Sequence, residues 1–595
     1  MPPFSKVLVA NRGEIAIRVF RTLRELGIGC VGVYSEADRG RAHVRAADEA
    51  YLVGPGPAAE SYLRGDVLVA TALRAGAEAI HPGYGFLAEN AAFARMVEEA
   101  GLTWIGPPPD AIELMGTKTA ARQVMRDAGV PIIPGGVDPV RSPDEVTALG
   151  AEIGYPLIIK AAAGGGGKGM EIVREAGDAE RAFESATRQG TKYFADPDVY
   201  VERYLENPRH VEVQVLADAH GNVIHLGERD CTIQRRHQKL VEETPSPAVD
   251  DRLRERIGRI AVDAARAAGY RSAGTIEGLL TPEGEYFFME MNTRIQVEHT
   301  VTEVVTGLDL VREQILVAAG EPLSLTQGDV VLRGHAIECR INAEDVAKGF
   351  LPAPGRISAY RAPAGPGVRV DSGIEAGDEV SELYDPMIAK LIVHDVDRDR
   401  AIARMLRALA EFRIEGTPTL LGFHRALLEH PCFRAGETCD GVVESEQLAR
   451  RAQELEKQFS HETTNVRQAS DGAMPTVPRL VGVEVDGRAY DVRLHVTEAP
   501  WADLARRRRE RRAHAGGAAA NGAVVSPMQG TVLKVAVGDG DPVGEGDLLL
   551  VVEAMKMENE IVAPREGVVS GLAVTVGAGV SSGQLLCIVA EPGEE

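Results

Sequence analysis

Residues 553–558 read EAMKME, which sets Lys556 between two methionines. The sequence around this stretch repeats itself at one constant offset. The first copy comprises Pro527, Gly530, Gly540, Val543, Gly546, Leu548 and Leu549, and the second Pro564, Gly567, Gly577, Val580, Gly583, Leu585 and Leu586. Two similar halves of strands and turns predict a quasi-twofold all-β domain with Lys556 at a hairpin tip between them. A helical surface patch of Glu, Lys and Met is the simpler interpretation of the six residues alone, but the duplication disfavours it.

The chain has 595 residues, which is too many for one hydrophobic core, so we expect about three to five domains. Its formal net charge of −23 disfavours general nucleic-acid binding, because an acidic surface repels phosphates. No stretch has the length of a membrane span, and the N-terminal residues lack the pattern of a signal peptide. We therefore expect a cytoplasmic protein that does not act at membranes.

The six cysteines form no CxxC pair, which predicts reduced thiols and no zinc site. They are Cys30, Cys231, Cys339, Cys432, Cys439 and Cys587.

Residues 6–35 (KVLVANRGEIAIRVFRTLRELGIGCVGVYS) predict a β-α-β opening: a buried strand, a turn at residues 11–14, an amphipathic helix to about Leu26, and a second strand over residues 29–34. Strands and helices continue to alternate past HPGYGFLAEN (residues 81–90), which predicts an open parallel sheet. The pattern GxGxxG is absent, so no dinucleotide is inferred.

The region before the repeated domain combines a hairpin signal, a run of arginines and an Ala/Gly tract. Residues 479–496 alternate in hydrophobicity about Asp486-Gly487, which is a strong hairpin signal. The arginine run at residues 506–512 is either a solvated helix end, the simpler interpretation, or a docking patch for an acidic partner. An Ala/Gly tract follows and predicts a tether with a span of only about 20 Å.

The middle of the chain carries the chemistry. Residues 160–170 (KAAAGGGGKGM) follow an apolar strand, and four glycines between two lysines suit a loop that closes over nucleotide phosphates. It is not a P-loop, because the ending GK[ST] is missing. If residues 290–298 are extended, five different polar side chains share one face: Glu290, Asn292, Arg294, Gln296 and Glu298.

Two further groups of polar residues lie in segments with strand-like sequence. Glu277, Glu290 and Asn292 supply hard oxygen ligands of the kind that Mg²⁺ prefers. In an extended chain His237 and Lys239 share a face beside Gln234, and they would supply two donors for anionic oxygens.

Together these segments resemble the biotin carboxylase branch of the ATP-grasp enzymes over about residues 3–446. The motifs that carry the resemblance occur in family order: ANRGEIAIR, HPGYGFLAEN, GTK, the glycine loop, RHVEVQVLAD, ERDCTIQRRHQK, EMNTRIQVEH and HAIECRINAED. The last 70 or so residues resemble biotinyl carrier domains, whose lysine between two methionines receives biotin; lipoyl carriers are the nearest rival. The whole chain is similar to the α subunit of an acyl-CoA carboxylase.

The resemblance implies a multidomain α/β and α+β fold. The expected parts are a Rossmann-like N-terminal domain (1–116), an ATP-grasp domain (117–334) with a glycine-rich lid at about 131–203, a biotin carboxylase C-terminal domain (335–446), a linker with a small β region for partner docking (447–522), and a flattened β-barrel carrier domain (523–592).

The resemblance also implies roles for individual residues. For ATP they are Lys118 and Lys160 on the phosphates, Gly166 and Gly167 in the closing loop, Glu202, Arg203, Tyr204 and Leu205 at the adenine, and His210, Gln234, His237, Glu277 and Glu290. Mg²⁺ or Mn²⁺ would be bound by Glu277, Glu290 and Asn292, and bicarbonate by Lys239, Arg294, Gln296 and the Val297 amide. The catalytic residues would be Glu298 as general base with Arg294 and Lys239, while Arg340 would contact the biotin ureido oxygen and Lys556 would carry biotin.

The expected reaction is ATP- and bicarbonate-dependent carboxylation of biotin on Lys556 through carboxyphosphate. Carboxybiotin would then pass to a separate carboxyltransferase β subunit that uses acetyl-CoA or propionyl-CoA, since too little sequence remains for a transferase domain. A biotin protein ligase would modify Lys556, and the chain would form a homo-oligomer within a larger hetero-complex. Two alternatives remain: a different ATP-grasp carboxylate ligase, and a non-catalytic biotin carrier or scaffold.

Overall fold

The computed structural model describes residues 2–136, 138–161, 170–194, 197–469, 476–485, 488–497, 522–554 and 557–590. The chain divides into two compact units, Met1–Gln453 and Glu454–Glu595, each of which is described by itself.

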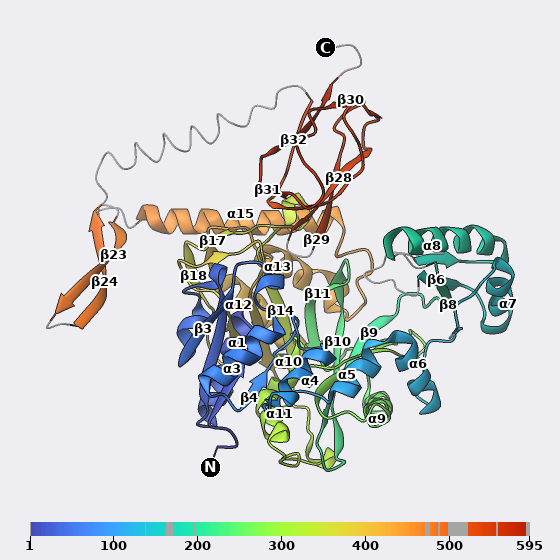
Figure 1. The fold of residues 1–595 in the computed structure, drawn as a ribbon, viewed down its shortest axis with the longest axis horizontal. Helices are drawn as coiled ribbons and strands as arrows, with labels where there is room; N and C mark the ends of the chain where they lie inside the picture. Colours follow the sequence, from blue (N-terminus) through green and yellow to red (C-terminus); the bar gives the residue numbers. More distant parts are fainter. Residues whose placement is uncertain are drawn as a thin grey trace. The chain divides into compact units, whose positions relative to one another are not determined.

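The N-terminal part of the first unit is an open sheet of five parallel strands in the order β3-β2-β1-β4-β5 (Figure 1). Its strands are β1 (Lys6–Val9), β2 (Gly29–Ser35), β3 (Glu49–Gly54), β4 (Ala79–His81) and β5 (Thr103–Trp104). The accompanying helices are α1 (Gly13–Glu25), α2 (Ala42–Ala46), α3 (Gly65–Ala75), α4 (Ala91–Glu99) and α5 (Pro109–Gly116). The predicted β-α-β opening and parallel sheet are confirmed.

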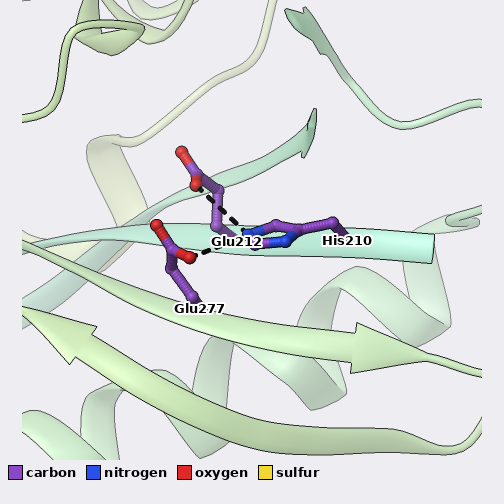
Figure 2. A group of neighbouring side chains, drawn as sticks. All are labelled: His210, Glu212 and Glu277. Carbon is purple, nitrogen blue, oxygen red and sulfur yellow. Dashed lines mark ion pairs between the residues drawn. The ribbon is translucent and has the colours of Figure 1, made fainter. Parts of the chain in front are cut away.

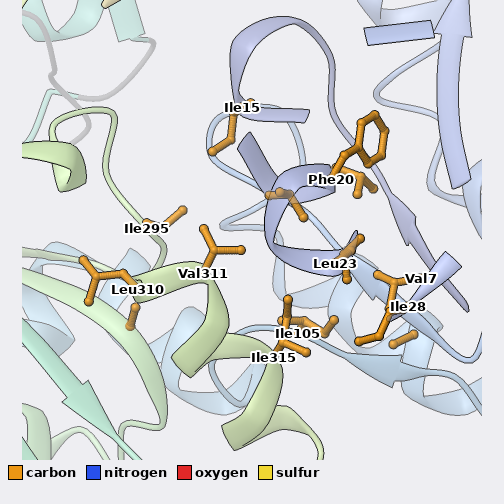
Figure 3. Close-up of a cluster of buried hydrophobic side chains, with 14 of the residues drawn as sticks. Val7, Ile15, Phe20, Leu23, Ile28, Ile105, Ile295, Leu310, Val311 and Ile315 are labelled. Atoms are coloured by element: carbon orange, nitrogen blue, oxygen red, sulfur yellow. The ribbon is translucent and has the colours of Figure 1, made fainter. Parts of the chain in front are cut away.

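A buried cluster joins this sheet to a distant part of the chain (Figure 3). Ile15 and Phe20 of α1 share it with Val311 of α11 (Leu310–Ala318) and with Ile295, which is fully buried. Apolar residues on one face of α1 explain this packing, because a helix repeats about every 3.6 residues. The cluster anchors the segment after Asn292 against the N-terminal sheet.

The largest sheet has eight strands in the order β13-β12-β9-β10-β11-β14-β21-β19, and its neighbours pair antiparallel. The strands are β9 (Arg209–Ala217), β10 (Val223–Arg235), β11 (Gln238–Thr244), β12 (Ser272–Leu280), β13 (Tyr286–Asn292), β14 (His335–Asn342), β19 (Val368–Ser372) and β21 (Met387–Asp395). Helix α9 (Asp251–Ala267) contributes Ile257 and Ala261 to an apolar cluster that it shares with this sheet. The sheet runs without interruption through the expected boundary at residue 334.

A smaller lobe holds the three-stranded sheet β7-β6-β8, from β6 (Leu157–Ala161), β7 (Met170–Val173) and β8 (Val199–Arg203). Helices α7 (Pro143–Ile153) and α8 (Ala179–Phe194) accompany it at the right of Figure 1. Helix α6 (Lys118–Asp127) precedes the lobe. The expected glycine loop, residues 162–169, connects β6 and β7 and lies outside the described residues.

The rest of the first unit is built on β14 and β21. Helices α10 (His299–Thr306), α12 (Arg398–Glu411), α13 (Leu421–Glu429) and α14 (Pro431–Arg434) belong here, and α15 (Glu446–Ala469) begins in this unit and continues into the second. Short strands pair as β15 (Glu344–Asp345) with β16 (Leu351–Pro352), β17 (Gly355–Arg356) with β20 (Glu379–Val380), and β18 (Ala359–Arg361) with β22 (Arg413–Glu415).

One sequence prediction needs correction in this region. Cys432 and Cys439 form a disulfide with their Cα atoms 5.5 Å apart, so the expectation that every cysteine is a reduced thiol is wrong. The turn after α14 brings the two sulfurs together, although seven positions separate them in the sequence. The free cysteines are buried.

The second unit contains the duplicated domain. Its two four-stranded sheets have the orders β25-β32-β30-β27 and β29-β28-β26-β31. The strands are β25 (Ala523–Val525), β26 (Gly530–Val535), β27 (Pro542–Val543), β28 (Leu548–Ala554), β29 (Met557–Val562), β30 (Gly567–Ser570), β31 (Gly579–Val580) and β32 (Leu585–Ala590). Corresponding strands of the two repeats, such as β28 and β32, lie in different sheets, which agrees with the predicted quasi-twofold all-β domain.

Antiparallel strands β28 and β29 flank the predicted modification site. Their pairing continues to Ala554 opposite Met557, and the two residues between them, Met555 and Lys556, lie outside the described residues. The other predicted hairpin is confirmed in its strands, β23 (Thr476–Val485) and β24 (Arg488–Thr497), which pair along their full length. The arginine run at 506–512 is outside the described residues. None of the described helices is both long and apolar enough to cross a membrane.

Candidate active site

Three carboxylates lie in a row across the large sheet. Glu277 of β12 is directly opposite Glu212 of β9 on one side and Glu290 of β13 on the other. Figure 2 shows Glu212 and Glu277 around His210, whose Nε2 is 2.9 Å from a Glu277 oxygen. Burial opposes protonation of His210, but the charge of Glu277 outweighs it and raises the histidine pKa. The row can therefore bind cationic groups.

Lys239 of β11 is the cation that joins these carboxylates to Glu298. Its ammonium donates to Glu212 at 2.5 Å, to Glu277 at 3.0 Å and to Glu298 at 2.7 Å. Burial favours the neutral amine, yet Glu212 and Glu298 dominate and hold the lysine pKa well above its usual value. Lys239 is thus a permanently charged centre with anionic groups on three sides.

Arg229 supports the row from within the sheet. It is fully buried and donates to Glu212 at 2.5 Å, to Gln214 at 2.7 Å and to Thr302 at 3.0 Å. A buried guanidinium fixes a carboxylate in orientation as well as in charge. Arg229 therefore determines which oxygen of Glu212 faces Lys239.

The segment after β13 differs from the predicted extended strand. Strand β13 ends at Asn292, and Glu298 is the N-terminal cap of α10. The prediction that residues 290–298 alternate along one strand is wrong, because the strand ends at Asn292, Ile295 packs into the buried cluster, and the chain turns at Val297 and Glu298. The turn nevertheless gathers the polar groups: Arg294 donates to Gln296 at 2.9 Å and to Asn292 at 3.1 Å.

Glu89 of the N-terminal domain also holds this segment. Its carboxylate accepts from Arg294 Nε at 2.7 Å and from the Thr293 amide at 3.0 Å. The Arg294 guanidinium is thereby oriented by groups from two domains.

Glu298 is fully buried between two cations. Arg340 donates to one of its oxygens at 3.0 Å and Lys239 to the other. Burial disfavours the carboxylate, but Lys239, Arg340 and Arg229 outweigh this and hold the Glu298 pKa well below its usual value. The Glu298 carboxyl group is therefore ionised at neutral pH.

Arg340 also pairs with a second buried acid. Its Nε donates to Glu242 at 2.6 Å, and burial raises the Glu242 pKa to about 7. Glu338, opposite Glu242 on β14, has its pKa raised to about 8, chiefly by burial. Glu338 therefore retains its proton at neutral pH, whereas Glu242 has a pKa close to neutral pH.

The residues predicted for the phosphates and the adenine lie at the small lobe and its junction, whereas the other residues predicted for the nucleotide lie on the large sheet or in its β10–β11 turn. Lys160 donates to Glu202 at 2.6 Å, and Arg122 pairs with the other Glu202 oxygen. The backbone of Arg203 and Tyr204 bonds to Pro134 and Pro156, and Leu205 packs in a small apolar cluster. Lys118 begins α6, but its side chain, like Gly166 and Gly167, is outside the described residues.

The turn between β10 and β11 corrects another prediction. Arg236 and His237 occupy it with φ of 48° and 64°, and Arg235 pairs with Gln238 across it. His237 therefore does not share an extended strand face with Lys239. Gln234 precedes the turn and donates to the Cys231 carbonyl at 2.8 Å.

The described donors suit a divalent cation. Glu277, Glu290 and Asn292 occupy neighbouring strands and offer carboxylate and amide oxygens, which are the ligands that Mg²⁺ prefers. Asn292 Nδ2 donates to Glu277 at 2.7 Å, which orients both groups.

Several supporting residues were missed from the sequence. Glu212 and Gln214 could have been found, because period-two spacing puts them on the same strand face as His210. Glu89, Arg229 and Glu242 carry no comparable local signal, since their partners are distant in the sequence.

Known families match most of the chain. Residues 3–112 match the biotin carboxylase N-terminal domain, 117–326 the carbamoyl-phosphate synthase L chain ATP-binding domain, 338–445 the biotin carboxylase C-terminal domain, and 522–589 the biotin-requiring enzyme family. These matches confirm the predicted fold class.

Individual relatives agree with the family matches. A pyruvate carboxylase subunit of Methanothermobacter thermautotrophicus is 56% identical over 73% of this chain and 88% of its own length. The biotin-dependent acyl-coenzyme A carboxylase alpha3 subunit of Mycobacterium leprae is 47% identical over 94% of both chains.

A solved structure gives the same result. The biotin carboxylase domain of Hydrogenobacter thermophilus 2-oxoglutarate carboxylase, a dimer in complex with MgADP, ADP and bicarbonate, is 49% identical with a TM-score of 0.68, and the match covers 73% of this chain and 96% of that one. The chain therefore belongs to the biotin carboxylase family and continues, in the same polypeptide, into a domain of the biotin-requiring enzyme family.

Proposed function

We propose that this chain carboxylates biotin on Lys556 and supplies the carboxyl group to a separate carboxyltransferase subunit that uses an acyl-CoA. As a biotin carboxylase it is an ATP-grasp ligase, and its cofactors are biotin, ATP and Mg²⁺. The observation that carries the proposed site is the position of Glu298, buried between Lys239 and Arg340.

Bicarbonate is proposed to bind at Arg294, Lys239, Gln296 and the Val297 amide. Its negative charge would compete with Glu298 for Lys239, and that competition would raise the pKa of Glu298 when a base is needed. Glu298 would then remove the bicarbonate proton while Lys239 and Arg294 stabilise the dianion. The dianion attacks the γ-phosphate of ATP, which yields the mixed anhydride carboxyphosphate and ADP.

The nucleotide is proposed to bind between the small lobe and the large sheet. Lys160 would leave Glu202 for a phosphate oxygen, and Lys118 would contact phosphate from the start of α6. Gly166 and Gly167 would cover the phosphates, and Glu202, Arg203, Tyr204 and Leu205 would border the adenine. His210, Gln234 and His237 would complete the nucleotide site.

Glu277, Glu290 and Asn292 would hold the divalent cation beside the phosphates. When bound, Mg²⁺ or Mn²⁺ neutralises charge on the transferring phosphoryl group. Lys239 contacts Glu277 directly, so the proposed metal and bicarbonate subsites would share one charged network.

Arg340 is proposed to contact the ureido oxygen of biotin. Its charge would stabilise the enolate form that accepts the carboxyl group, and Glu298 and Glu242 hold its guanidinium in place. Lys556 would carry biotin after modification by a biotin protein ligase.

An acyl-CoA such as acetyl-CoA or propionyl-CoA is the proposed final acceptor. The Mycobacterium leprae acyl-coenzyme A carboxylase protein matches over 94% of both chains, which includes the carrier region. Pyruvate is the second candidate, because a pyruvate carboxylase subunit has the higher identity over a shorter part of the chain.

Two measurements on the full-length protein test the function. Phosphate release from MgATP should require bicarbonate and increase with free biotin; release without bicarbonate would favour another carboxylate ligase. Native capture on a releasable avidin resin, followed by mass spectrometry, should find biotin on Lys556 and a co-eluting carboxyltransferase. An unmodified Lys556 would contradict the proposal that this residue carries biotin.

The partner is proposed to dock on residues 479–514, which contain most of the β23–β24 hairpin. Deleting this segment should abolish complex formation and leave ATP cleavage stimulated by free biotin; an intact complex would refute the assignment. The complex is proposed to be cytoplasmic and to contain more than one copy of this chain.

A further inference from the structure

Lys390 is a fully buried lysine on β21 that none of the assigned roles uses. Its ammonium donates to the Val297 carbonyl at 2.7 Å and lies 3.2 Å from a Glu14 oxygen. It also lies 5.8 Å from the centre of the Tyr84 ring, and the Tyr84 hydroxyl donates to the same Glu14 oxygen. The Lys390 ammonium, from the C-terminal domain, therefore contacts groups from both the N-terminal domain and the loop after β13.

The position of Lys390 relative to Arg340 relates its contact with the Val297 carbonyl to the proposed base, Glu298. The two residues are directly opposite each other on paired strands β21 and β14. Arg340 binds the Glu298 carboxylate, and Lys390 binds the carbonyl of the preceding residue, Val297. Two neighbouring cations thus hold two consecutive residues of the same segment.

The Val297 carbonyl belongs to the peptide group that includes the Glu298 amide, and that group is planar. Fixing it limits rotation on both sides, which sets where the Val297 amide and the Glu298 side chain point. Burial of an ammonium group is costly unless it is paired and hydrogen-bonded. Glu14 and the Val297 carbonyl provide this compensation, whereas packing within β21 would require only an apolar side chain.

We propose that Lys390 is a positioning residue for bicarbonate. Its hydrogen bond to the Val297 carbonyl holds the Val297–Glu298 peptide group in place beside β14, the strand that carries Arg340. The inference rests on the proposed function, because it assigns bicarbonate to the Val297 amide and proton removal to Glu298. Asp371, opposite Lys390 on β19, is already paired with Arg369 at 2.6 Å, so Lys390 remains directed at Val297 and Glu14.

The test is steady-state kinetics of ATP cleavage by the full-length chain, with bicarbonate and ATP varied separately. Lys390→Met keeps the length of the side chain and removes its donor and charge. It also leaves Glu14 buried without this cation, so the double variant Glu14→Gln/Lys390→Met is measured beside it; the introduced glutamine retains an acceptor for Tyr84. The matched control is Lys348→Met, an exposed lysine 3.6 Å from Asp345.

In the double variant, kcat/KM for bicarbonate should fall by about 10- to 100-fold, the range expected for losing a hydrogen bond from a charged donor. The KM for ATP should change by less than about twofold, and the melting temperature should stay near that of the parent. Lys348→Met should leave all three quantities unchanged.

Two results would overturn the inference. One is a folded Lys390 variant with unchanged kinetics toward bicarbonate. The other is an equal loss toward ATP and bicarbonate together with a lower melting temperature in both variants, which would indicate a general structural role. Failure of the proposed function itself would be recognised earlier, because the unmodified protein would then cleave ATP without bicarbonate.

Discussion

Lys239 and Glu298 form a buried ion pair with 2.7 Å between Nζ and a carboxylate oxygen. The same ammonium contacts Glu212 and Glu277, so one cation bridges carboxylates from two strands and the start of α10. In this arrangement the proposed base is restrained by the residue proposed to bind its substrate. Arrival of bicarbonate would release the restraint.

Replacing Glu298 with Gln should remove proton abstraction and keep most of the packing. We expect kcat for bicarbonate-dependent ATP cleavage to fall by about 10²- to 10⁴-fold, which is the usual contribution of a general base. Nucleotide binding, measured by calorimetry, should be retained. Glu25→Gln at an exposed position of α1 is the control. Unchanged turnover in Glu298→Gln would instead favour a non-catalytic carrier or scaffold.

Replacing Lys239 with Met should destabilise the first unit in addition to stopping catalysis. Glu212, Glu277 and Glu298 would lose their shared cation, and breaking a buried ion pair typically costs about 3–5 kcal/mol of folding free energy. Lys239 is the charge that contributes most to holding the pKa values of Glu277 and Glu298 below their usual range, so both pKa values should rise in the variant. The parent gains stability from these depressed pKa values at neutral pH that the variant lacks, so the difference in stability between the two proteins should narrow as pH falls from about 7 to 4. Thermal unfolding of both proteins across this range measures the difference, and a variant that melts with the parent at every pH would contradict the prediction.

Glu338 should make the stability of the parent protein depend on pH. Its folded pKa of about 8 exceeds its unfolded value, so the folded state retains a proton that the unfolded state releases. Stability should therefore fall as pH rises between the two values, by up to about 1.4 kcal/mol per pH unit for each retained proton. Glu338→Gln keeps a polar partner for Thr300 and should flatten this dependence; the exposed Glu25→Gln should not. An identical pH profile in Glu338→Gln would be inconsistent with this assignment.

Lys556→Arg should separate the two halves of the reaction. Arginine preserves the charge but is not a substrate for biotin attachment, so capture on avidin and carboxylation of the acyl-CoA should both be lost. ATP cleavage with free biotin should remain within about twofold of the parent, because the residues proposed for that chemistry belong to the first unit. Loss of both activities would show that Lys556 also matters for the carboxylase unit.

Sequence patterns predicted the parts of the fold that depend on local order. Strands β1 and β2 can be recognised from their apolar runs, and α1 from its helical spacing of apolar residues, because each element buries one continuous face. The strands of the carrier domain followed from its internal repeat. The alternation over residues 290–298 pointed to residues that do lie close together, but not because they share one strand face. The strand ends at Asn292, and the chain then turns, with Ile295 packed in the buried cluster.

The residues that sequence reasoning missed depend on long-range contacts. Arg229 reaches Thr302 across 73 positions of the sequence, and Glu89 reaches Thr293 across 204. Lys390 lies within the mostly apolar strand β21, and nothing in its local sequence distinguishes it from a polar residue without a functional role. The disulfide between Cys432 and Cys439 likewise requires a turn that their spacing does not specify.

The unbroken eight-stranded sheet limits how this protein can be dissected. Strand β11 pairs with β14 through Val241, Glu242, Glu243 and Thr244, which spans the expected boundary at residue 334. A truncation there would leave unpaired backbone donors and acceptors along both new sheet edges, and such edges recruit strands from other molecules. Fragments cut at this position should therefore aggregate, and co-expression of the two pieces should recover soluble material only where β11 and β14 re-form their shared ladder.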